Sequence, residues 1–133
     1  MAIPSGSGSE VLRNFGINAN NNATAKVDFG GTTGTGSVRS SGNTSGVINV
    51  PANVIITVLS ITFVATATIG TLSGTIDWQG SGTEITVFKQ MGMADNHTFV
   101  YSDKIVLREG DELGLYSNAG CDIYGHFIYQ DWT

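Results

Sequence analysis

The sequence predicts an all-β protein that folds as one antiparallel β-sandwich with about eight strands. Apolar and polar residues alternate over several short segments, and turn residues recur about every 8–12 positions. No segment of ten or more residues shows the apolar period of a helix. The chain has 133 residues, which suits one domain with one modest core.

Residues 1–10 are expected to form a flexible N-terminal arm, and residues 11–133 the single β-sandwich domain. Gly and Ser alternate from Ser5 to Ser9, and such a sequence gives the backbone little reason to settle in one conformation. The arm either stays a disordered tail or becomes ordered on a neighbouring subunit.

Two predicted strands and a long polar stretch follow the arm. Residues 11–17 and 25–29 alternate apolar with polar side chains, as half-buried strands do. Residues 30–46 contain almost no apolar side chain, and loops of this length are uncommon inside a compact domain. Three interpretations stay open for this stretch: a contact loop, an irregular edge strand or a mobile segment.

Residues 54–64 form the strongest predicted strand, because apolar side chains occupy both of its faces. A strand of this kind is covered on both sides, here by the opposite sheet and by either a loop or another chain. The expected faces are Ile55, Leu59, Ile61 and Phe63 on one side and Val54, Ile56, Val58 and Val64 on the other.

The second half of the chain supplies the remaining strands. Glycines permit a hairpin loop at residues 79–82, and residues 90–96 are expected to form another loop. Ile85 and Val87 are expected on one face of their strand, with Phe88 on the other. The predicted strands are residues 72–78, 85–88, 98–102, 104–107, 113–115 and 123–129. This number and spacing of strands is typical of a sandwich or jelly roll.

The composition suits a β domain with neutral surfaces. Only 13% of the residues are charged, against about a quarter in average soluble domains, and 18 residues are glycine. Neutral polar side chains cost less free energy to remove from water than charged ones do. The composition therefore also suits a domain whose faces are covered by neighbouring chains.

Charge and cysteine content exclude several classes of function. The net charge is −5 and the six Lys and Arg residues are dispersed, so we expect neither nucleic-acid binding nor attachment to anionic membranes. The single cysteine provides no disulfide framework and no zinc site. The first residues lack the basic and apolar regions of a signal peptide, so we expect synthesis in a cytoplasm.

No group of residues makes a strong case for catalysis, and we expect a protein that is not an enzyme and needs no cofactor. Cys121 and His126 lie five residues apart on one predicted strand, so their side chains point to opposite faces. Asp77 and Glu84 flank the hairpin loop and could approach as a carboxylate pair for glycoside hydrolysis. They are equally well interpreted as solvent-facing strand residues.

The histidines and aromatic residues leave further alternatives open. His97 and His126 lie near scattered carboxylates, too few for a metal site within one chain, although one His per chain could meet its symmetry mates on a trimer axis. Aromatic side chains could line a sugar-binding groove, or fill the core or a subunit interface. These aromatic residues are Trp78, Tyr101, Tyr116, Tyr124, Tyr129 and Trp132.

Four segments resemble a known class of proteins. TFVYSDKIVL (98–107), EGDEL (109–113) and IYQDW (128–132), together with IPSGSGSEVL (3–12), resemble small virion structural proteins of tailed bacteriophages. More loosely, a Leu-x-x-Gly-Asp turn before an apolar strand and an aromatic-rich last strand are similar to trimeric jelly rolls of the TNF/C1q type. The resemblance implies a capsid decoration (cement) protein, a head fibre, or a neck or tail component.

The expected function is therefore that of a non-enzymatic phage virion protein on the capsid surface, most simply a decoration protein. Its expected partners are copies of itself in a homotrimer and the major capsid protein or other virion proteins. The alternative is a tail, neck or fibre component that binds a receptor or carbohydrate. The residues expected at interfaces are Ser5, Ser7, Glu10, Val54, Ile56, Val58, Trp78, Tyr129 and Trp132.

Overall fold

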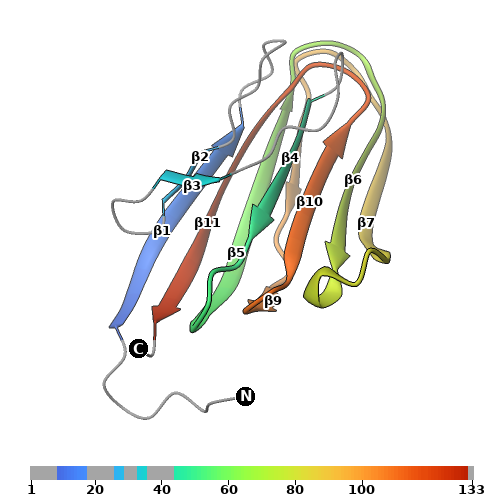
Figure 1. The fold of residues 1–133 in the computed structure, drawn as a ribbon. Helices are drawn as coiled ribbons and strands as arrows, with labels where there is room; N and C mark the ends of the chain where they lie inside the picture. The colour runs from blue at the N-terminus through green and yellow to red at the C-terminus, as the bar shows by residue number, and fades with distance from the viewer. Residues whose placement is uncertain (1–8, 18–25, 29–32, 36–43, 132–133) are drawn as a thin grey trace.

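The computed structural model describes residues 9–17, 26–28, 33–35 and 44–131. These residues form eleven strands and one turn of 3-10 helix, η1 (Trp78–Gly80), as Figure 1 shows. Ser5, Ser7 and Trp132, three of the expected interface residues, lie outside the described residues, as does most of the polar stretch 30–46. None of the helical structure in the described part of the chain is long and apolar enough to cross a membrane.

The strands form two antiparallel sheets that face each other (Figure 1). The seven-stranded sheet has the order β3-β2-β1-β11-β5, with β8 and β9 both paired to the far side of β5. The four-stranded sheet has the order β4-β10-β6-β7. The seven-stranded sheet contains β1 (Ser9–Ile17), β2 (Lys26–Asp28), β3 (Thr33–Thr35), β5 (Val54–Ala65), β8 (Thr98–Tyr101), β9 (Ile105–Arg108) and β11 (Cys121–Asp131). The four-stranded sheet contains β4 (Thr44–Asn49), β6 (Ile69–Asp77), β7 (Glu84–Met93) and β10 (Glu112–Ser117).

The strand order is that of a jelly roll. Because β8 and β9 lie end to end along the same side of β5, they occupy a single strand position. Each sheet then has four main strand positions, which we call lanes: β1-β11-β5-β8/β9 and β4-β10-β6-β7. The chain crosses between the two sheets after β3, β4, β5, β7, β9 and β10, and these crossings wind the strands into a double Greek key. The predicted fold class, a jelly-roll-like antiparallel sandwich, is confirmed. The short strands β2 and β3 and the break between β8 and β9 explain why eleven strands are found where about eight were expected.

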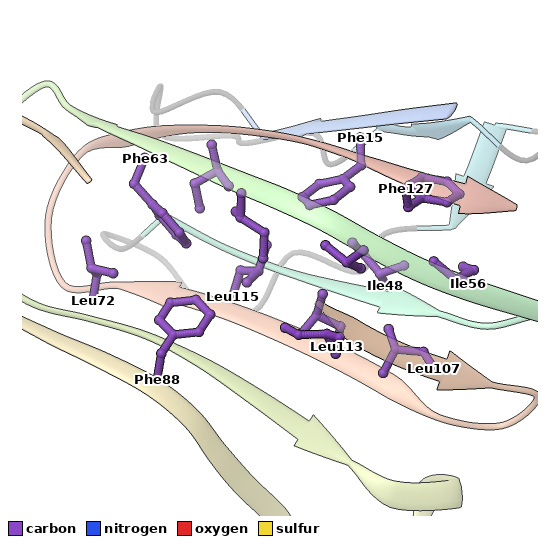
Figure 2. Close-up of a cluster of buried hydrophobic side chains, with 14 of the residues drawn as sticks. Phe15, Ile48, Ile56, Phe63, Leu72, Phe88, Leu107, Leu113, Leu115 and Phe127 are labelled. Atoms are coloured by element: carbon purple, nitrogen blue, oxygen red, sulfur yellow. The ribbon is translucent and has the colours of Figure 1, made fainter. Parts of the chain in front are cut away.

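The core lies between the sheets and is built from inward positions of both. Phe15, Phe63 and Phe127 point into it from the seven-stranded sheet, and Leu113 and Leu115 point back from β10 (Figure 2). β11 buries every second residue from Cys121 to Tyr129, as its alternation predicted.

β5 contains a β-bulge that changes which of its residues face the core. Its pairing with β11 shifts between His126 and Phe127, so Leu59 is an extra residue on β5. Before the bulge the even-numbered residues are buried, and after it the odd-numbered residues Ile61 and Phe63 are buried. The predicted grouping of Ile55 with Ile61 and Phe63 on one face is therefore wrong.

The same bulge overturns one part of the expected interface. Val54, Ile56 and Val58 are only 2, 1 and 1% exposed, because they fill the core of their own sandwich. Their side chains are covered by the four-stranded sheet of the same chain and do not face a neighbour.

A second irregularity, in β7, changes which residues of that strand share a face. The pairing of β6 with β7 shifts between Gly74 and Thr75, which leaves Val87 as an extra residue and turns Phe88 into the core. Ile85, expected on the face opposite Phe88, lies on the same face, opposite Ile76, and is exposed at the end of the strand. β7 also continues to Met93, so the predicted loop at residues 90–96 begins too early.

β1 begins within the predicted arm. Ser9 pairs with Asp131 and Glu10 with Gln130, so these two residues belong to the seven-stranded sheet. The polar stretch 30–46 contributes β3, an edge strand paired to β2, and the beginning of β4. For residues 33–35 the edge-strand interpretation is the correct one of the three.

Candidate functional site

The outer face of the seven-stranded sheet carries an unusual share of exposed apolar side chains. Of the ten large hydrophobic side chains exposed in the described residues, five lie on this face. They come from all four main lanes. They are Leu12 (65% exposed), Val64 (37%), Val100 (53%), Val106 (65%) and Tyr124 (50%).

The strand register arranges the middle of this face in three rows that run across the lanes. The first row is Leu12, Ile128, Thr57 and Val106; the second is Asn14, His126 and Ser60; the third is Gly16, Tyr124, Thr62 and Val100. None of these residues is Asp, Glu, Lys or Arg. We call these three rows the neutral face.

His126 lies at the centre of the neutral face. Its Nε2 is 3.0 Å from the Ser60 hydroxyl oxygen, and its ring meets the Tyr124 ring edge-on with 5.7 Å between centroids. The side chain is half-buried within the single chain. The imidazole is therefore held in place by its own sheet while one side of it stays open to solvent.

Cys121 lies on the opposite side of β11 from His126, as predicted. Its thiol is fully buried in the core, and burial together with the nearby Asp122 carboxylate raises the pKa of Cys121 to about 11. A protonated, buried thiol on the far side of the sheet cannot act as a nucleophile with His126 as its base.

Charged side chains occur at the margins of the neutral face. The next row beyond Leu12 is Glu10, Gln130, Ile55 and Arg108, with the two charged residues at its opposite ends. Glu10, one of the expected interface residues, is exposed and accepts a hydrogen bond from the Gln130 amide at 3.2 Å. The neutral face is thus bordered at one end by a row with opposite charges at its two corners, and at the other end by a row that contains the exposed Asp122 beside Val64.

The outer face of the four-stranded sheet is different in character. Glu112, Asp77 and Glu84 follow one another across β10, β6 and β7 in a single row, and Lys89 lies further along β7. Charges of this density make the face costly to remove from water. Of the two outer faces, the neutral one is therefore better suited to contact another protein surface.

Asp77 and Glu84 are direct partners across β6 and β7, so the expected approach of their backbones is correct. The Asp77 carboxylate is used to hold the turn between these strands. It accepts hydrogen bonds from the Gly82 amide at 3.0 and 3.2 Å and from the Ser81 hydroxyl at 3.0 Å. In the described ranges, no three His, Cys, Asp or Glu side chains gather as metal ligands.

Tyr129 and Trp78, two aromatic residues expected at interfaces, lie in surroundings that differ from each other. Tyr129 is 8% exposed and packs under the Arg13 guanidinium, whose carbon lies 4.5 Å from the ring centroid. It is a core residue, so its placement at an interface was wrong. Trp78 is 56% exposed in η1 at one end of the sandwich, with the Arg108 guanidinium carbon 5.6 Å from its ring centroid.

Sequence reasoning missed the residues that form the neutral face. The signal available was the pair of apolar runs at residues 98–101 and 105–107, where both faces of short strands carry apolar side chains. Such runs predict a second covered face, as for residues 54–64, but the bulge in β5 concealed which residues lie on it.

No protein-family model matches the chain, and no curated protein matches it. Among solved structures, it is similar to Eiger TNF from S. frugiperda, with 10% identity over 93% of each chain and a TM-score of 0.43. It is also similar to murine APRIL, with 10% identity over 89% of this chain and 98% of that chain and a TM-score of 0.42. A Clostridium thermocellum structure of the CBM22-1-GH10 modules of xylanase 10B shares 12% identity over 93% of this chain and 26% of that one, with a TM-score of 0.38.

Proposed function

We propose that this chain is a structural building block that associates with copies of itself through the neutral face, as a homotrimer. We further propose that the assembly is a decoration (cement) protein on the capsid surface of a bacteriophage. It acts by covering and joining protein surfaces and catalyses no reaction.

The observation that carries the proposal is the exposure of an uncharged, partly apolar sheet face in the single chain. Four lanes about 4.8 Å apart and three rows about 6.8 Å apart give the neutral face an area of about 400 Å², and the whole outer face of the sheet, over strands about 36 Å long, has about 700 Å². A standard interface buries about 800 Å² on each partner. The neutral face therefore has the chemistry of a protein contact and about half the area of a standard one, so a contact of standard size also includes the rows beyond it.

The charges at the margins favour a cyclic arrangement of identical chains. Glu10 and Arg108 stand at opposite ends of one row, and hence at the same height along the strands. A rotation axis parallel to the strands brings β9 of one chain near the Glu10 end of β1 of the next. Opposite charges then meet at each contact, as they also do when two copies place their neutral faces together about a two-fold axis parallel to the strands.

The phage assignment is supported by the resemblance of residues 3–12, 98–107, 109–113 and 128–132 to small virion structural proteins. The trimer is supported by the looser similarity of the 107–111 turn to trimeric jelly rolls. The partners of the assembly are then the major capsid protein or other virion proteins, which it contacts outside the neutral face. Synthesis in the host cytoplasm and assembly onto the particle follow from this role.

The mass of the purified chain in solution tests self-association. We expect a trimer by sedimentation velocity at micromolar concentration, and a monomer for Val106→Asp, because this change would place a buried carboxylate in the contact. The matched control is Thr86→Asp, which adds the same charge at an exposed position of β7 on the other sheet and should leave the trimer intact. A wild-type chain that stays monomeric at high concentration would refute the proposal.

The capsid role needs a separate experiment. Purified chain should saturate particles assembled without it and raise the temperature at which they release their DNA. Failure to bind such particles, with the trimer intact, would remove the phage role and leave the self-association standing.

One observation favours a second candidate, a receptor- or carbohydrate-binding tail module. Trp78 exposes its ring at the end of the sandwich beside the Arg108 guanidinium, and aromatic rings of this kind stack on sugar faces. A glycan array with the wild-type chain, Trp78→Ala and Trp132→Ala would support this candidate if binding occurs and is lost in a variant. Absence of binding to every glycan would dismiss it.

A further inference from the structure

We propose that His126 makes self-association through the neutral face dependent on pH, so that the assembly present at neutral pH dissociates when the imidazole takes up a proton. This inference rests on the proposed function, because it takes the neutral face as the contact between copies of the chain.

The first support is the position of His126. It stands in the middle row, between the row of Leu12, Ile128, Thr57 and Val106 and the row of Gly16, Tyr124, Thr62 and Val100. In the neutral face it is the only side chain of a type that titrates between pH 5 and 8. A contact that covers both neighbouring rows must cover the imidazole as well.

The second support is that the imidazole is already fixed before any contact forms. Its Nε2 is 3.0 Å from the Ser60 hydroxyl oxygen, and the Tyr124 ring packs against it at 5.7 Å. The ring therefore has little freedom to swing out of the contact to keep a charge in water.

Each charged group around His126 is separated from it by at least one residue of the sheet. On β11, Asp122 is two rows away on the same face, beyond Tyr124. β1 presents the neutral Asn14 beside the ring, with Glu10 two rows off, and β5 presents Ser60. Beyond Ser60, Asp103 and Lys104 lie in the exposed segment between β8 and β9 and carry opposite charges.

The direction of the effect follows from proton linkage. In the separate chain, the exposed side of the ring lets water solvate the imidazolium. In the assembly, the same charge would face apolar side chains of a neighbour without a carboxylate to balance it, which is unfavourable. Separate chains therefore bind more protons than assembled chains, and association weakens as the pH falls through the range in which His titrates.

Sedimentation velocity at pH 7.5 and pH 5.0 tests this inference with two matched variants. We expect the wild-type trimer to dissociate at least tenfold more readily at pH 5.0. His97→Gln, which changes the exposed histidine in the turn between β7 and β8, should behave as the wild type does. His126→Gln keeps a neutral polar side chain, and the affinity between its chains should be the same at both pH values.

A second measurement does not depend on how His126→Gln folds. The imidazole proton resonance of His126, followed by NMR, should titrate at a lower pH in the wild-type trimer than in the monomeric Val106→Asp variant. Equal midpoints, or a wild-type trimer equally stable at pH 5.0 and 7.5, would overturn the inference while leaving self-association intact. A chain that is monomeric at pH 7.5 would instead refute the proposed function and this inference with it.

Discussion

Two glycines inside strands each lie opposite a phenylalanine of the neighbouring strand. Gly125 of β11 pairs with Phe15 of β1, and Gly74 of β6 pairs with Phe88 of β7. A Cβ built on Gly125 would be 2.4 Å from the Phe15 ring, and one on Gly74 would be 2.2 Å from the Phe88 ring. In both sheets the aromatic ring lies across the glycine, which compensates for the side chain that the glycine lacks.

This packing predicts the effect of Gly125→Ala. The added methyl group would overlap both the Phe15 ring and the Ser60 carbonyl oxygen at 2.8 Å, so the core must shift and we expect a loss of about 1–3 kcal/mol in unfolding free energy. Urea denaturation measures it. Gly16→Ala is the control, because its nearest atom would be 3.7 Å away, and an equal midpoint for the two variants would contradict the packing argument.

At the scale of elements, a buried carboxylate joins three parts of one end of the sandwich. Asp111 is 5% exposed in the turn between β9 and β10. Its Oδ1 accepts a hydrogen bond from the Gln79 amide and its Oδ2 one from the Arg108 amide, both at 3.0 Å. Its backbone carbonyl accepts a hydrogen bond from the Val50 amide at 3.1 Å. The side chain thus ties η1 to the turn, and the backbone ties the turn to the segment after β4.

Replacement of Asp111 by alanine should therefore destabilise the fold. Two part-buried amides lose their acceptors, and we expect a loss of about 2–4 kcal/mol. Asp103→Ala, at an exposed carboxylate between β8 and β9, should change the unfolding free energy by less than about 0.5 kcal/mol. Differential scanning calorimetry of both variants gives the comparison, and equal melting temperatures would show that the turn does not depend on this carboxylate.

The strands also show where the alternation of apolar and polar residues predicts the buried face correctly and where it does not. β11 pairs regularly with β1 from Ile123 to Asp131, and its predicted inward face was correct from Ile123 to Tyr129. β5 and β7 each contain one extra residue, and in both strands the predicted faces failed. A bulge exchanges inward and outward positions from one residue to the next, and nothing in the local composition marked Leu59 or Val87 as the extra residue.

At the scale of the whole molecule, the two outer faces of the sandwich have opposite character. One carries the neutral face and the other a row of three carboxylates with Lys89 further along. A molecule with this asymmetry can bury one face between copies and keep the other hydrated. Because association stabilises the folded chain by mass action, thermal stability should depend on protein concentration.

The melting temperature should therefore rise by about 2–5 °C for each tenfold increase in concentration of the wild-type chain. Val106→Asp should melt at one temperature at all concentrations, and Thr86→Asp should follow the wild type. A melting temperature of the wild-type chain that is independent of concentration would argue against association through the neutral face.

The sequence by itself determined the fold class and the regular strands, because alternation, turn residues and the absence of helical periodicity are local properties that appear in the chain as written. The candidate site was decided by the tertiary structure. Three expected interface residues, Val54, Ile56 and Val58, became core, and Tyr129 did too, whereas Val100, Val106 and Tyr124 came together from three strands. Which side of a strand meets water depends on register and on single extra residues in pairing with a partner strand, and these are set by contacts between segments far apart in the sequence.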